Sequence, residues 1–173
     1  GAMAQNVSKD DYKAGKDKIT AEYKLAKASC AALSGNPNDI CMAAAKGDEK
    51  VALAELEAGY KPTSETRYQA RIARADADYG LAKERCDDRA GNTKDVCIKE
   101  AKSAQTAARA DAKAQMKTTD ANATASKKSA DARRDATSAK LDAQYTAAKE
   151  KCDTYAGNAK DICVNEAKVK FGQ

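Results

Sequence analysis

Three short stretches decide the fold of this chain: residues 34–41 read SGNPNDIC, residues 90–97 read AGNTKDVC and residues 156–163 read AGNAKDIC. Each ends in a cysteine, and another cysteine stands five residues before each glycine. The flanking sequence recurs as well, with a tyrosine seven residues before the first cysteine and Ala-Lys four residues after the second. The chain therefore repeats one supersecondary unit three times.

Each repeated stretch has the residues of a tight turn between two helices. A glycine just past a helix adopts the left-handed conformation most easily. The asparagine after it fits a helix N-cap, with an aspartate three residues later as its capping partner. A connection this short makes the two helices antiparallel. The predicted turn and cap residues are Gly35, Asn36, Asp39, Gly91, Asn92, Asp95, Gly157, Asn158 and Asp161.

The six cysteines flank these turns, each about one helical turn from the corner. This placement predicts three local disulfides, namely Cys30–Cys41, Cys86–Cys97 and Cys152–Cys163. A bridge that closes so short a loop stabilises a fold by about 3 kcal/mol in the chain-entropy description. Such staples suit a chain whose apolar residues are mostly alanine, with no tryptophan and one phenylalanine.

The helices show a heptad-like apolar seam that carries the first cysteine of each pair. We expect Gly47 to mark a kink or weak point in its helix. The seam of the first helix is Ile19, Tyr23, Ala26, Cys30 and Leu33. The seam of the third helix, before Cys86, is Tyr68, Ile72, Ala75, Tyr79, Ala82 and Cys86. The seam of the helix before the third turn is Leu141, Tyr145, Ala148, Cys152 and Tyr155.

The predicted fold is all-α: three disulfide-stapled antiparallel helical hairpins that form a helical bundle or a short hairpin array. Residues 1–7 are expected to be an expression scar and flexible N-terminus. The hairpins are expected at 8–60, 61–116 and 117–173, within one domain overall. Equivalent connections, KPTSE from Lys61 and KTTDA from Lys117, separate them and favour hairpins that fold back on one another. The third repeat has ten extra residues before Cys152, which predict either a protruding arm or a plain solvated helix.

The residue types argue against catalysis. The chain has no histidine, so the usual general base and most transition-metal sites are missing. We therefore predict no enzyme activity, no catalytic residue, no cofactor and no metal site. Adjacent acids such as Asp87 with Asp88, or Asp76 with Asp78, lack calcium-loop spacing and are expected on solvated helix faces.

The chain is mildly basic, with a formal net charge of +5. Four basic residues in the third repeat form a candidate contact for a polyanion, which would be phosphate or an anionic envelope polymer. They are Lys127, Lys128, Arg133 and Arg134. Nucleic-acid binding is not expected, because acids are interspersed throughout and aromatic stacking residues are scarce.

The repeated pattern Y..AK..C....GN..D(I/V)C...AK resembles small exported alanine- and lysine-rich proteins of Gram-negative bacteria, some loosely labelled TolA-like or cell-envelope proteins. The resemblance spans Tyr12 to Lys170 and implies a periplasmic or secreted setting, but no activity. The opening GAMAQ agrees, because GAM looks like an expression scar joined to a mature start after a removed signal peptide. Paired cysteines also suit an oxidising compartment, and no apolar run is long enough to span a membrane.

Three functions remain open from the sequence. The first is a non-enzymatic periplasmic or secreted helical protein with a structural, envelope-associated or chaperone-like binding role. The second is a metal or small-ligand carrier that uses clustered carboxylates or thiols. The third is a self-assembling oligomer or filament subunit, because the truncated third repeat leaves an end that could accept a neighbour. The partner is unknown from sequence; an envelope protein or an anionic polymer is expected.

Overall fold

The computed structural model describes residues 7–173. The expression scar and flexible N-terminus were predicted for residues 1–7, and residues 1–6 of that segment lie outside the described part. The described residues form five α-helices and one short 3-10 helix, and they confirm the all-α prediction. The helices are α1 (Lys9–Cys30), α2 (Gly35–Tyr60), α3 (Ser64–Cys86), α4 (Gly91–Lys151) and α5 (Gly157–Lys170), with η1 at Cys152–Thr154. The chain divides into two compact units, unit 1 (Gly1–Asp120) and unit 2 (Ala121–Gln173).

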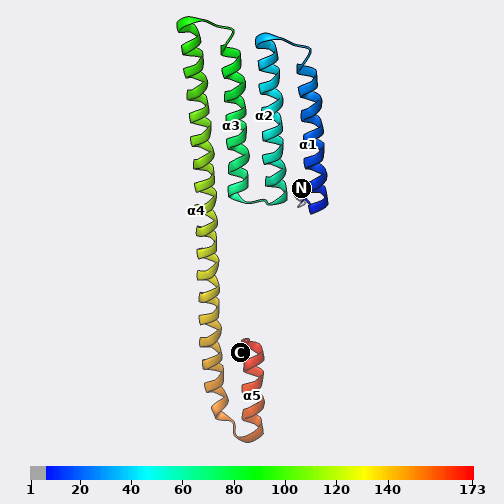
Figure 1. The fold of residues 1–173 in the computed structure, drawn as a ribbon. Helices are drawn as coiled ribbons and strands as arrows, with labels where there is room; N and C mark the ends of the chain where they lie inside the picture. The colour runs from blue at the N-terminus through cyan, green and yellow to red at the C-terminus, as the bar shows by residue number, and fades with distance from the viewer. Residues whose placement is uncertain (1–6) are drawn as a thin grey trace. The chain divides into compact units, whose positions relative to one another are not determined.

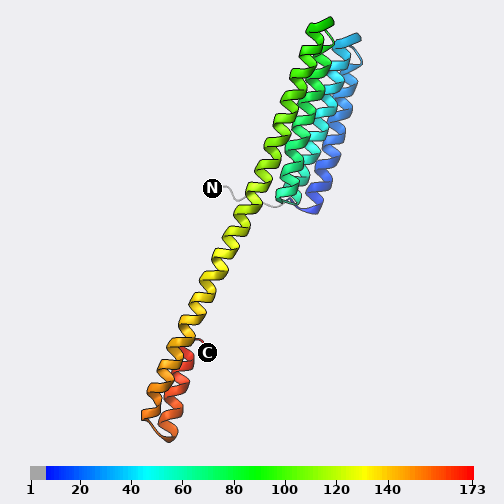
Figure 2. The same cartoon turned by 90° about the vertical axis from the view of Figure 1, so that its left-hand side faces the viewer.

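Unit 1 is one layer of antiparallel helices. Helix α2 packs against α1 on one side and against α3 on the other, whereas α1 and α3, both fully described, do not pack together. Figure 1 shows the order α1, α2, α3 and the first part of α4, and Figure 2 shows the same layer from its edge. Because the described helices of unit 1 form a single layer, each of them keeps two faces in solvent.

Helix α1 is held against α2 by contacts along its length. The ring of Tyr12 stacks on that of Tyr60, with 4.3 Å between the ring centroids. The Tyr12 hydroxyl donates a hydrogen bond of 2.5 Å to Glu57. The side chain of Leu56 lies over Gly15, where there is no room for a Cβ atom. Val7, which the sequence placed in a flexible terminus, donates its backbone N–H to the carbonyl of Gly59.

Local sequence sets where α1 and α3 begin. Ser8 is the N-cap of α1, and its hydroxyl accepts a hydrogen bond of 3.0 Å from the N–H of Asp11. The connection predicted at Lys61 is present, because Pro62 lacks the N–H that would continue α2. Thr63 and Thr66 then start α3 with a reciprocal capping box.

The connection predicted at Lys117 is wrong, because α4 continues through it without a break from Gly91 to Lys151. The physical reason is the absence of proline: KTTDA from Lys117 has no counterpart of Pro62 and no glycine that would end a helix. The second hairpin and the third therefore share one helix, and the boundary between the two units falls inside it.

The core of the described residues consists of small side chains and disulfides, with three larger aliphatic residues, Ile19, Val51 and Ile72. The seam prediction holds for Ile72, Ala75 and the first cysteine of each pair, which are buried. It fails for three members that are exposed, namely Ala26, Leu33 and Tyr155. A layer one helix thick buries only a narrow stripe of each helix, so the outer members of a seam stay in water.

Gly47 does not kink its helix. Helix α2 is continuous through it, and Gly47 is buried where α2 meets α3. A Cβ atom added there would stand 3.0 Å from the Cβ of Ala77. The glycine therefore allows the two hairpins to approach closely.

Unit 2 contains residues 121–151 of α4, η1 and α5. Its buried side chains are Cys152, next to the turn, and Ala167, in the last turn of α5. With so small a core, the disulfide between Cys152 and Cys163 is a main link between α5 and η1, which directly follows α4.

The three turn glycines adopt the left-handed conformation, with φ of +65° at Gly35 and +57° at both Gly91 and Gly157. The predicted asparagine N-cap is wrong for α2 and α5. These helices begin at the glycine itself, and neither shows a side-chain capping bond among the described residues. The asparagine thus falls inside the first turn, where its side chain is directed elsewhere.

Among residues 7–173 we find no helix with the length and apolar character that a membrane crossing requires.

Candidate functional site

All six cysteines are paired as predicted, with one disulfide across each of the three helical turns. The Cα–Cα distances are 5.6 Å for Cys30–Cys41 and 5.7 Å for both Cys86–Cys97 and Cys152–Cys163. The first cysteine of each pair is fully buried. Three disulfides indicate an oxidising compartment outside the cytoplasm.

The turn of the first hairpin is joined to the second hairpin. Asn36 donates its side-chain amide to the carboxylate of Asp88, just past the end of α3. Asn38 donates to the backbone carbonyl of Cys30 at 2.7 Å, which closes the turn on itself. The asparagine predicted to be a cap therefore connects neighbouring hairpins.

Three of the four carboxylates weighed as cation ligands in the sequence, Asp76, Asp87 and Asp88, are engaged in other contacts. Asp87 forms an ion pair of 3.2 Å with Lys94, and Asp88 accepts from Asn36. Asp76 accepts from Arg109 at 2.7 Å and from Gln105 at 2.8 Å. These contacts link the ends and middles of neighbouring helices.

The Asp76–Arg109 pair changes the acidity of its carboxylate. Partial burial alone would raise the pKa of Asp76, but the hydrogen bonds from Arg109 and Gln105 outweigh it and lower that pKa below its ordinary value. No group of three or more acidic or cysteine ligands suited to a metal ion occurs in the described part of the chain.

Unit 1 has an open groove of about 770 Å³ on one face of the layer, mainly between α2 and α3. Small residues on both helices leave it hollow, among them Ala43, Gly47 and Ala77. Lys46 and Asp76 also line it, so charges of both signs stand at this surface. The groove has no concentration of one charge that would select a ligand.

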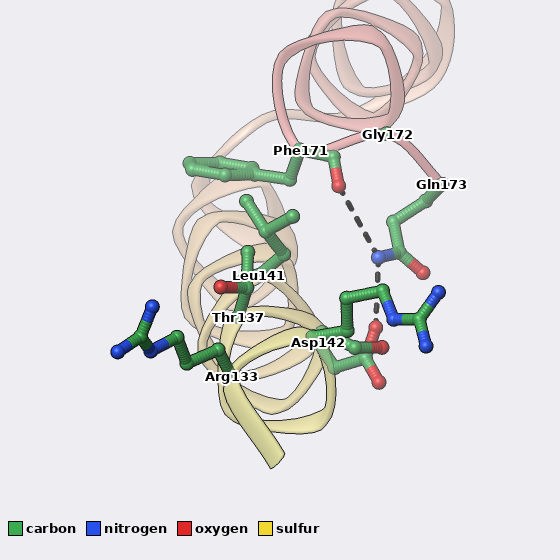
Figure 3. A pocket seen from close by; sticks show the side chains of 9 residues that line it. Arg133, Thr137, Leu141, Asp142, Phe171, Gly172 and Gln173 are labelled. Carbon is green, nitrogen blue, oxygen red and sulfur yellow. Dashed lines mark hydrogen bonds between the residues drawn. The ribbon is translucent and has the colours of Figure 1, made fainter. Parts of the chain in front are cut away.

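Unit 2 has a recess of about 480 Å³ where the end of α5 meets α4, and we call it the arginine recess. Figure 3 shows it from close by. The residues that line it are Arg133, Arg134, Thr137, Ser138, Leu141, Asp142, Phe171, Gly172 and Gln173.

The arginine recess has an apolar part and a polar part. The ring of Phe171 lies next to Leu141, with Thr137 beside it (Figure 3). On the opposite side the amide nitrogen of Gln173 donates to Asp142 at 2.9 Å and to the carbonyl of Phe171 at 3.3 Å. Arg133 extends from α4 on the side away from this polar pair (Figure 3).

Local sequence explains how these groups come together. Helix α5 ends at Lys170, and the left-handed Gly172, with φ of +67°, turns the chain after it. On α4, Arg133, Thr137 and Leu141 recur every four residues and so share one face of the helix. The recess therefore forms where this face meets the residues that follow α5.

The structure separates the four basic residues predicted as polyanion contacts. Arg133 and Arg134 line the recess, whereas Lys127 and Lys128 do not. Arg134 pairs with the carboxylate of Asp131, and Arg133 has no ion-pair partner among residues 7–173. Arg133 thus presents an unpaired guanidinium on the same face of α4 as the hydroxyl of Thr137.

The sequence analysis missed the remaining lining residues, Thr137, Ser138, Leu141, Asp142, Phe171, Gly172 and Gln173. The four-residue spacing from Arg133 to Leu141 was a usable signal for a shared face. Nothing in the sequence indicated that this face meets the end of α5.

Comparison of the chain with models of known protein families, with curated proteins and with solved structures gave no match.

Proposed function

We propose that this protein is a non-enzymatic helical binding protein of the periplasm or the extracellular space, associated with the cell envelope, and that its arginine recess contacts an anionic polymer. The observation that carries the proposal is the guanidinium of Arg133, which has no ion-pair partner among residues 7–173 and shares one face of α4 with the hydroxyl of Thr137 at the arginine recess. Guanidinium groups bind phosphate and carboxylate oxygens in a two-pronged geometry, and hydroxyls add further donors.

The disulfides support the setting of this proposal. Three bridges that staple a chain with so thin a core are advantageous only where thiols stay oxidised. A net charge of +5 further favours association with polyanions of the envelope through long-range attraction.

A carrier that uses thiols is less well supported, because all six thiols are consumed in disulfides. A carrier that uses paired carboxylates is also less well supported, because Asp76, Asp87 and Asp88 are hydrogen-bonded or ion-paired. Binding through arginine requires neither reduction of a disulfide nor disruption of an ion pair between helices.

The test is binding of fluorescently labelled linear polyphosphate, followed by anisotropy at low and at physiological salt. Replacing both arginines of the recess, Arg133→Gln with Arg134→Gln, should weaken binding at least about tenfold, because the loss of even one hydrogen bond to a charged group costs roughly 1.5–3 kcal/mol. Both side chains are exposed on α4, so the fold should persist, as circular dichroism would verify.

A matched control is available on the same helix. Lys127→Gln with Lys128→Gln removes the same formal charge but lies outside the arginine recess. The lysine variant should bind polyphosphate within about twofold of the parent, which is the size expected for exposed charges acting only through screened attraction. If both variants lost the same affinity for polyphosphate, binding would depend on net charge and not on the arginine recess, which would contradict the proposal. A parent protein that does not bind polyphosphate would also overturn it.

A further inference from the structure

The two terminal helices, α1 and α5, carry large apolar side chains on faces that no other helix covers. Leu25 on α1 is 71% exposed, and on α5 Ile162 is 51% and Val169 is 85% exposed. On α1 the buried Ile19 and Cys30 lie on the side that meets α2, roughly opposite Leu25. On α5 the buried Ala167 is likewise about opposite Val169.

The repeat shows what covers these faces elsewhere in the chain. Ile162 and Val169 stand one residue before and six residues after Cys163, as Ile40 and Gly47 do around Cys41. In α2 that face packs against α3, where Gly47 meets Ala77. The uncovered face of α5 is therefore the equivalent of the α2 face that α3 covers in unit 1.

The uncovered face of α1 is the equivalent of the matching face of α3. Ala21 and Leu25 precede Cys30 by nine and five residues, as Ala77 and Leu81 precede Cys86. In α3 this face contacts α2 at Ala77, and Leu81 is half-buried. In α1 the equivalent residues Ala21 and Leu25 are exposed. One chain thus has the two complementary halves of the hairpin–hairpin interface, each without its partner.

We propose that α5 of one copy packs against α1 of a second copy and continues the α2–α3 interface between molecules. The antiparallel register that sets Gly47 on Ala77 places Val169 on Ala21. It also places Ile162 opposite Ala28, one helical turn beyond Leu25.

Charge supports this register. Three residues before Val169 is Glu166, and three residues after Ala21 is Lys24, so the antiparallel register brings an acid opposite a base. The equivalent positions in the α2–α3 interface are Ala44 and Gly80, which carry no charge. The intermolecular copy therefore gains an ion pair that the intramolecular one lacks. Val169 in place of glycine sets the two helices somewhat further apart.

This contact joins two different faces, so it is head-to-tail and produces rings or open chains of molecules instead of closed symmetric dimers. It is small, because α5 has 14 residues. We therefore expect weak association that appears in the micromolar to roughly 1 mM range. The proposal is independent of polyanion binding by the arginine recess.

Sedimentation velocity over a concentration series is the first test. Val169→Lys should raise the apparent dissociation constant about tenfold or more, because a contact of an apolar side chain is replaced by a charge. Val169 is so exposed that the monomer should remain folded. A parent protein that stays monomeric up to about 1 mM, or a Val169→Lys variant that associates like the parent, would overturn the proposal.

Charge exchange tests the register. Lys24→Glu alone and Glu166→Lys alone should each weaken association roughly threefold to fivefold, the size of an exposed ion pair. The double variant should return to within about twofold of the parent. Two single effects that simply add in the double variant would show that these residues do not face each other.

Crosslinking tests the head-to-tail geometry. Ala21→Cys and Val169→Cys are prepared as separate proteins and mixed under mild oxidation. A disulfide-linked product that contains one copy of each variant supports the proposal. Products that join only Ala21→Cys to itself, or only Val169→Cys to itself, would contradict it.

Discussion

Gly47 and Ala77 lie where the first two hairpins approach closely, since a Cβ atom on Gly47 would stand 3.0 Å from that of Ala77. This distance is shorter than nearly all contacts between real Cβ atoms, so a side chain at residue 47 would require α2 or α3 to shift by a few tenths of an ångström. Hairpins that pack through such small residues gain dispersion contacts along the backbone, which partly replaces the missing core of large side chains.

Substitution of Gly47 by alanine should therefore lower stability relative to the same substitution at Gly80. Gly80 also lies in a helix, but a Cβ atom there meets nothing within 4 Å. Gly80→Ala should stabilise by up to about 1 kcal/mol through helix propensity. The free energy of unfolding of Gly47→Ala should be about 1–3 kcal/mol lower than that of Gly80→Ala, because overpacking forces the helices apart. Denaturant unfolding measures both, and equal stabilisation by the two substitutions would show that the interface adjusts freely.

Loss of the third disulfide should unfold the whole of α5, whereas loss of the first disulfide should leave its two helices folded. With Cys152→Ala and Cys163→Ala, α5 retains Ala167 as its buried residue, so we expect it to detach and unfold. With Cys30→Ala and Cys41→Ala, unit 1 should lose about 2–4 kcal/mol but keep α1 and α2 helical, because α2 also packs on α3. Amide hydrogen exchange by mass spectrometry distinguishes the outcomes. Retained protection in α5 would show that its packing suffices without the bridge.

Stability should fall at alkaline pH through Tyr12. Its pKa is raised because its hydroxyl donates to Glu57, with partial burial and the carboxylate charge acting in the same direction. The folded state thus favours the protonated phenol. This contribution is fully present below the ordinary tyrosine pKa of about 10 and is lost as pH rises through the higher folded-state value.

Tyr12→Phe should remove that part of the pH dependence while keeping the stack on Tyr60. The free energy of unfolding, measured from about pH 8 to pH 11, should therefore fall less steeply with pH for the variant than for the parent. Tyr155→Phe is the control, because its hydroxyl has no hydrogen-bond partner in residues 7–173. If the free energies of unfolding of Tyr12→Phe and the parent fell with pH at the same slope, Tyr12 would not cause this pH dependence.

Sequence alone predicted the parts of the fold that depend on neighbouring residues. The disulfides followed from cysteine spacing around a glycine turn. The connection at Lys61 followed from repeat equivalence, and Pro62 accounts for its presence in the structure. The connection at Lys117 was wrong because repeat equivalence was extended to a segment that lacks the residue which breaks the helix. The burial of Gly47 was also missed, because a glycine within a helix gives the same sequence pattern whether it weakens the helix or makes room for a neighbouring helix.

The candidate site was predictable only in part. Arg133 and Arg134 stand out in the sequence as a basic pair, and so do Lys127 and Lys128. What distinguishes the two pairs is the meeting of α4 with Phe171 and Gln173, which lie more than thirty residues further along the chain. No local pattern encodes such a contact, so the apolar and polar parts of the recess emerged only from the structure.

The middle of α4 should be the first segment that a protease reaches. All side chains from residues 121 to 130 are exposed, and a helical segment that buries no side chain is only marginally stable in water. This stretch also contains weak helix formers such as Asn122, Thr124 and Ser126. Limited trypsin digestion should therefore cut first after Lys127 or Lys128.

Replacing these weak formers with alanine should slow that cleavage. The triple variant Asn122→Ala, Thr124→Ala and Ser126→Ala should gain about 1–2 kcal/mol of helix stability, which lowers the cleavage rate roughly fivefold or more. Ser103→Ala with Thr106→Ala, in the part of α4 beside α3, should leave it unchanged. Earlier cleavage within α1 or α3 would contradict the assignment of the weak segment.

The single layer of unit 1 also bears on how such a chain can change over evolutionary time. A conventional core is shared by all its helices, so an inserted helix disturbs every neighbour at once. Here each hairpin brings its own disulfide and meets the next across one face. Duplicating a hairpin adds one interface and leaves the others intact. Gene duplication can therefore lengthen or shorten this architecture without redesigning its interior.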